Sequence, residues 1–130
     1  MKNRDIYLSA LCHIGETDST ETNEDYEERA PYLIAAFCTE SAETDTAYRI
    51  ENGLEPRGEM NCVCIPLEAD FPCADRFISA ATSYLAAMLI IDENPELSDK
   101  FFDRYCDIMA TIQSEIPARI EKIAQKYGAF

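Results

Sequence analysis

The chain has 130 residues, 47% of them apolar, with 25 acidic and 11 basic side chains and a formal net charge of −14. This length suits one domain with one modest core, and the apolar fraction excludes a wholly disordered chain. The charge argues against binding along nucleic-acid phosphates, because that binding needs clustered lysine and arginine.

The first predicted helix covers residues 4–14. Tyr7, Ala10, Leu11 and Ile14 recur at helical spacing on one face. Asn3 is the expected N-cap, since asparagine accepts a hydrogen bond from a free backbone N–H of the first turn. The polar and acidic residues 16–25 predict a loop.

A long second helix is predicted from residue 31 to about residue 51, after a weak first turn at 24–30. Pro31 sets this start, because proline cannot donate to the carbonyl four residues back but suits the first helical position. The apolar face of this helix steps by three or four residues through Tyr26, Ala30, Leu33, Phe37, Ser41, Thr44 and Tyr48.

Residues 53–73 interrupt the helical pattern with prolines and glycines. Residues 60–67 alternate in polarity and include Val63 and Ile65, which predicts an extended arm or a short β segment near residues 53–72. A single strand is unstable alone and needs a partner. We therefore expect this arm to contact a neighbouring subunit through Met60, Val63, Ile65 and Leu67.

The third predicted helix, residues 74–92, contains no charge between Phe77 and Ile91. Its main stripe includes Leu85 and Met88, and its reverse side carries small residues. Fifteen helical residues rise only about 22 Å, short of the roughly 30 Å of a bilayer core. A helix that is apolar all round is therefore expected at the centre of a bundle rather than across a membrane.

A fourth helix is predicted after a short turn, with Ser98 as N-cap and a hydrophobic staple between Leu97 and Phe102. Its apolar stripe is Phe102, Tyr105, Met109, Ile112 and Ile116. The short connection predicts an antiparallel hairpin with the third helix. Residues 118–127 could add a last helix after Pro117. The expected fold is mainly α: one domain, residues 1–130, forming a small four- to five-helix bundle with an extended arm.

The sequence offers little for catalysis, so we expect neither an enzyme nor a cofactor. His13 is the only histidine, and a position near the end of a helix suits it structurally. Cys62, Cys64 and Cys73 are the best candidate zinc ligands, but the paired spacing of structural zinc sites is missing. Buried apolar roles are the simpler interpretation. With no signal-peptide pattern at residues 1–16, reduced thiols in an intracellular protein are expected.

Several stretches resemble a family of small proteins encoded among the head and tail genes of phages and prophages of Gram-positive bacteria. These stretches are DYEERAPYLIAAFCTE (25–40), LEADFPCADRFISAATSYLAAMLIIDENPELSDKFFDRYCDIMATI (67–112) and IPA (116–118). They cover about half of the chain and include no catalytic motif.

The resemblance implies a head–tail connector, or adaptor, subunit of the virion, made in the bacterial host cytoplasm. Such subunits assemble as a ring, and the expected partners are copies of the chain, the portal, and head-completion or tail proteins. DNA would pass the lumen without specific binding, since acidic walls repel it over the roughly 8 Å of electrostatic screening at physiological salt.

An alternative is a monomeric acidic helical phage protein that inhibits a host nucleic-acid-binding factor by mimicking nucleic-acid charge. This hypothesis predicts a stable monomer with acids gathered on one exposed face. Recovery of a host nucleic-acid-binding protein, rather than portal or tail components, would distinguish it from the connector.

Overall fold

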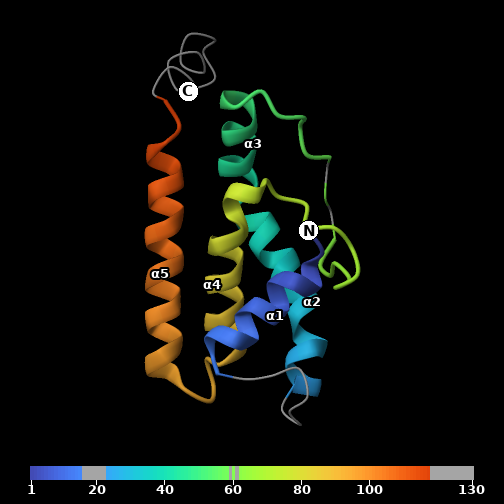
Figure 1. Ribbon diagram of the computed structural model, residues 1–130, viewed down its shortest axis with the longest axis vertical. Coiled ribbons are helices and arrows are strands. Elements are labelled where there is room, and N and C mark those ends of the chain that lie inside the picture. The colour runs from blue at the N-terminus through green and yellow to red at the C-terminus, as the bar shows by residue number, and fades with distance from the viewer. Residues whose placement is uncertain (16–22, 59, 61, 118–130) are drawn as a thin grey trace.

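The computed structural model describes residues 1–15, 23–58, 60 and 62–117. These residues form α1 (Asn3–His13), α2 (Asn23–Glu40), α3 (Ala42–Glu51), the 3₁₀ turn η1 (Asp75–Phe77), α4 (Ile78–Leu89) and α5 (Pro95–Ser114). Helix α4 lies between α5 and α2, and α1 crosses it obliquely (Figure 1). The prediction of a mainly α, small helical bundle is confirmed.

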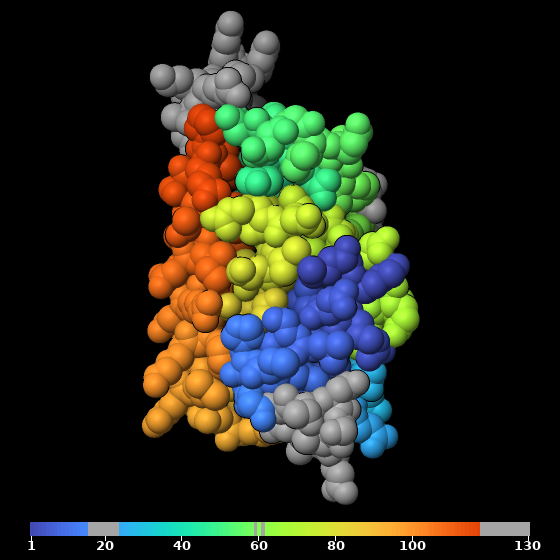
Figure 2. Space-filling view, in the orientation of Figure 1, coloured from blue at the N-terminus to red at the C-terminus, as the bar shows by residue number. Residues whose placement is uncertain are grey.

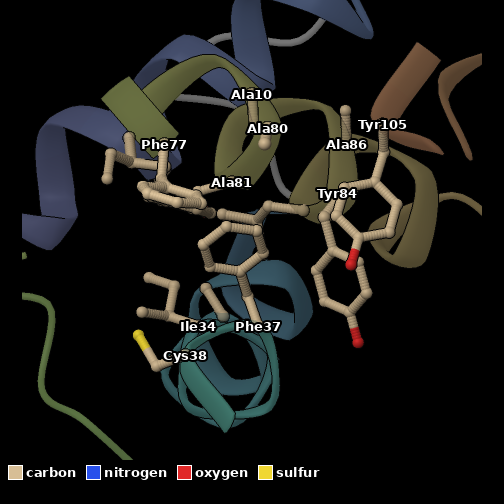
Figure 3. Close-up of a cluster of buried hydrophobic side chains, with 14 of the residues drawn as sticks. Ala10, Ile34, Phe37, Cys38, Phe77, Ala80, Ala81, Tyr84, Ala86 and Tyr105 are labelled. Atoms are coloured by element: carbon tan, nitrogen blue, oxygen red, sulfur yellow. The ribbon is translucent and has the colours of Figure 1, made fainter. Parts of the chain in front are cut away.

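Helix α4 is the centre of this bundle, as its uncharged sequence predicted. It packs against α1, α2 and α5. Leu85 is almost completely buried, and Met88 is partly buried against the same core. Figure 3 shows aromatic rings from three elements meeting here, with Phe37 of α2 beside Tyr84 of α4 and Tyr105 of α5. The small residues Ala80, Ala81 and Ala86 let the neighbouring helices approach this closely.

The predicted antiparallel hairpin of α4 and α5 is confirmed, but the predicted cap of α5 is wrong. Asn94 is the N-cap, and its side chain accepts a 3.2 Å hydrogen bond from the Leu97 N–H. Ser98 is instead buried inside the helix, where its hydroxyl donates to the Ala87 carbonyl across 2.8 Å. The helix begins four residues earlier than expected, and Phe102 is exposed whereas Phe101 packs against the core.

The predicted long helix over residues 31–51 is also wrong. Helix α2 continues through Pro31 and ends at Glu40, and α3 starts at Ala42. Pro31 has no N–H to donate to the Glu27 carbonyl four residues earlier. Glu27 is exposed, so water can replace the missing donor. The break falls at Ser41, whose buried hydroxyl lies 3.5 Å from the Cys73 sulfur.

Asn3 is not the N-cap of α1. Lys2 holds that position, and Asn3 is fully buried in the first turn, where its side-chain amide donates to the Pro66 carbonyl. Within the described residues between α3 and η1 no strand forms, although one isolated bridge joins Lys2 to Asp70. The possible last helix over 118–127 lies outside the described residues. Among the helices that are described, none has the length and hydropathy needed to cross a bilayer.

Candidate subunit-contact site

The linker segment, residues 52–74, joins α3 to η1 and is the predicted subunit-contact arm. Its second half is fixed to the start of α1, since the Asn3 N–H donates to the Ala69 carbonyl at 3.0 Å and the Arg4 N–H to the Leu67 carbonyl at 2.8 Å. The first N–H groups of any helix lack intrahelical acceptors, and the linker carbonyls supply them. Figure 2 shows this part of the linker pressed against the N-terminal residues.

A buried carboxylate on α3 fixes the two ends of the linker segment. Asp45 is fully buried, and its carboxylate lies 3.2 Å from Arg49 Nε and accepts a 3.0 Å hydrogen bond from the Ala74 N–H. Arg49 in turn donates to the Glu55 carbonyl at 2.7 Å and to the Pro72 carbonyl at 2.9 Å. One ion pair therefore holds the beginning and the end of the linker together.

Arg57 adds a second cation to the same cluster. Its Nη1 lies 3.6 Å from the Asp45 carboxylate and 3.2 Å from the Cys73 sulfur, while Nη2 donates to the Cys38 carbonyl at 3.2 Å. The last carbonyls of a helix lack intrahelical donors, so a guanidinium at the end of α2 is well placed. The linker is thus tied to α2 as well as to α3.

The structure does not bring the four predicted contact residues onto one exposed surface. Val63 is 80% exposed, whereas Ile65 and Leu67 are only 7% and 3% exposed and belong to the core of their own chain. Met60 is partly buried against that core. In this conformation only Val63 could make an extensive contact with a neighbour, because Ile65 is tied to α2 through the Pro31 carbonyl and Leu67 is tied to α1 through the Arg4 N–H.

Two exposed apolar residues outside the predicted set are better candidates. Ile50 at the end of α3 is 65% exposed, and Leu54 at the start of the linker is 47% exposed. A shallow groove of about 320 Å³ beside Ile50 is lined by Ala42, Glu43, Thr46 and Ala47 of α3. The spacing of Ala42, Thr46, Ile50 and Leu54 is a four-residue repeat, and this was the sequence signal available for the surface.

A second groove, of about 310 Å³, lies between α4 and α5 and is lined by two arginines in a protein with a formal charge of −14. Arg76, Ser79, Arg104 and Asp107 contribute to its lining. Arg76 pairs with Glu115 at 2.6 Å, and this guanidinium lowers the pKa of the Glu115 carboxyl. Arg104 makes no hydrogen bond or ion pair to another described residue, so its charge is available to an acidic group from elsewhere.

The candidate zinc ligands do not come together. Cys62 is exposed, Cys64 is half-buried, and Cys73 turns inward toward Cys38. Across the described residues there is no group of three or more metal-ligating side chains that could hold an ion. His13 forms a 2.7 Å hydrogen bond between Nδ1 and the Ser9 carbonyl. Its ring makes a T-shaped contact with the ring of Phe101.

Comparisons with known proteins leave the family of the chain open. No family model matches it, and neither the curated proteins nor the solved structures gave a significant match. Inferences about function therefore rest on the residues and contacts described above.

Proposed function

We propose that the chain is a structural subunit of a phage or prophage head–tail connector that assembles as a ring between portal and tail. The proposal is supported by the sequence resemblance over residues 25–40, 67–112 and 116–118 and by the compact helical fold. An assembly subunit needs a rigid body that keeps its shape among neighbours, and the linker segment is tied to three helices rather than left loose.

The observation that carries the proposal is the exposed apolar surface formed by α3 and the start of the linker, which we call the α3 surface. It consists of Ala42, Thr46, Ala47, Ile50 and Leu54. Ile50 and Leu54 are the large apolar side chains of this surface, and a contact that removes them from water gains about 25 cal/mol per Å² buried. A second copy of the chain is the proposed occupant.

Closed rings need two different patches, because each subunit contacts one neighbour with one surface and the next neighbour with another. The groove containing Arg76 and Arg104 is the proposed second patch. With 25 acidic side chains on each copy, a neighbour presents carboxylates to this groove, and Arg104 has no described internal partner to compete with them. Charge pairing of this kind contributes to orientation as well as to affinity.

The test is the oligomeric state of the full chain, measured by light scattering and negative-stain imaging over a concentration series, with and without portal. We expect rings that are lost in the double variant Ile50→Asp, Leu54→Asp. Phe102→Asp on α5 is the control, since it adds one such charge at another exposed apolar residue and should leave assembly unchanged; each single variant, Ile50→Asp or Leu54→Asp, is its charge-matched counterpart.

A monomer under all these conditions, portal included, would contradict the connector. If that monomer also retained a nucleic-acid-binding protein from a host lysate, the inhibitory alternative would replace it. Arg104→Glu separates the two patches: it should weaken ring formation with the α3 surface intact, and unchanged rings would remove Arg104 from the contact.

A further inference from the structure

Two cysteines from distant parts of the chain meet beneath the linker segment. Cys38 lies near the end of α2 and Cys73 lies at the end of the linker, 35 positions later. Their sulfurs are 3.8 Å apart, and both side chains are buried. The sulfurs must approach by about 1.8 Å to reach the roughly 2.05 Å of a disulfide bond.

The surroundings of Cys73 favour its thiolate form. Arg57 Nη1 lies 3.2 Å from the Cys73 sulfur and the Ser41 hydroxyl lies 3.5 Å away. The hydrogen bond with Cys38 lowers the pKa of Cys73, with further help from Ser41 and Arg57, although burial and the nearby Asp45 carboxylate oppose them. The same hydrogen bond and burial raise the pKa of Cys38. Because the thiolate is the nucleophile in disulfide exchange, the two sulfurs have different roles.

We propose that Cys38 and Cys73 form a redox-active dithiol pair that closes to an intramolecular disulfide on reaction with a small organic disulfide. The Cys73 thiolate attacks one sulfur of the small disulfide, forms a mixed disulfide and releases one thiolate. Cys38 then loses its proton to that thiolate and attacks the Cys73 sulfur, which releases the second. The two cysteines lose two electrons, and the small disulfide gains them as one thiol and one thiolate, which takes its proton from water.

The bond would join the end of the linker segment directly to α2. In the reduced chain that junction depends on the Arg57 contacts and the Asp45 cluster, all of which are non-covalent. A covalent link across 35 positions restricts the unfolded chain and makes the folded linker harder to release. The pair is therefore a switch in the strength of attachment of the linker, and this inference does not depend on the proposed ring.

The test uses the full chain with the four other cysteines replaced by serine: Cys12, Cys62, Cys64 and Cys106. All four are exposed or half-buried, so their replacement should leave the fold intact. The folded protein is treated with bis(2-hydroxyethyl) disulfide, and alkylation followed by mass spectrometry counts the remaining thiols. We expect loss of both thiols, one crosslinked peptide pair joining Cys38 to Cys73, and a rise in Tm on the order of 10 °C.

Two further variants in this background test the order of the steps. Cys38→Ser should stop at a mixed disulfide on Cys73, whereas Cys73→Ser should leave Cys38 unmodified over the same time. Retention of both thiols in the folded chain, or crosslinking only after denaturation, would overturn the proposal. If the chain with the four serine substitutions does not fold, the chain with all six cysteines is treated in the same way. Peptide mapping then shows whether Cys38 and Cys73 are crosslinked.

Discussion

Replacing the buried Asp45 by alanine should be one of the most damaging single changes at the linker. The substitution leaves the buried Ala74 N–H without its acceptor, which costs about 1–3 kcal/mol of stability. It also leaves Arg49 and Arg57 without their counter-charge. Removal of one partner of a buried ion pair costs about 3–5 kcal/mol in total, so we expect a loss of about 4 kcal/mol. Asp45→Asn keeps an oxygen for Ala74 and should lose about half as much.

The assay is urea unfolding followed by circular dichroism, with a thermal scan alongside. An unfolding entropy of about 2.1 cal/mol/K per residue over 130 residues converts 4 kcal/mol into a fall in Tm of about 15 °C. Glu43→Ala, an exposed acid on the same helix, is the control and should change stability by less than about 0.5 kcal/mol. An Asp45→Ala variant within about 1 kcal/mol of the unmodified chain would refute the argument that Asp45 anchors the linker.

Three further predictions concern the helices. Leu85→Ala in α4 should lower the unfolding free energy by about 3 kcal/mol in urea titrations, because Leu85 is fully buried, whereas Val63→Ala should cost less than about 0.5 kcal/mol. Asn94→Ala and Ser98→Ala should each cost about 1 kcal/mol, and a null effect of Asn94→Ala would contradict its role as N-cap of α5. Burial, together with the nearby Glu40, raises the pKa of the Tyr105 hydroxyl above its usual 10. The stability that the neutral Tyr105 hydroxyl contributes is therefore complete below pH 10 and is lost at higher pH. The urea concentration at the unfolding midpoint should fall as the pH rises above 10, and this fall should be less steep in Tyr105→Phe.

The helices that could be predicted well from sequence are those with local determinants. An uncharged run with small residues on its reverse side placed α4 at the centre of the bundle. The short connection before α5 placed these two helices side by side. In both cases the deciding signals lie within the helix itself or within a few residues of it.

The errors occur where a distant residue decides the local structure. Ser41 continues a repeat of three and four residues in sequence, yet α2 ends beside it, where its hydroxyl lies 3.5 Å from the sulfur of Cys73, 32 positions later. Asn3 and Ser98 are good caps by residue type, but each bonds to a carbonyl from another element. Helix capping preferences describe a helix end in water and do not include such partners.

The contact site shows the same division. Alternation in the linker correctly identified apolar residues, but not that Ile65 and Leu67 would face their own core. Asp45 in sequence resembles one more surface acid, and its pairing with Arg49 four residues later was the only local hint of burial. Arg49, Arg57 and the linker carbonyls meet around Asp45 only in the folded chain, so sequence alone could not predict this cluster.

The attachment of the linker to α1 also constrains the order in which the molecule can fold. Residues 3 and 4 bond to partners more than sixty positions later, so during synthesis α1 must wait for its acceptors to leave the ribosome. The α4–α5 hairpin makes contacts between near neighbours in the chain and can form quickly once synthesised. Helix α1 is therefore made well before these partners, and until they arrive its first N–H groups have no acceptor within the chain.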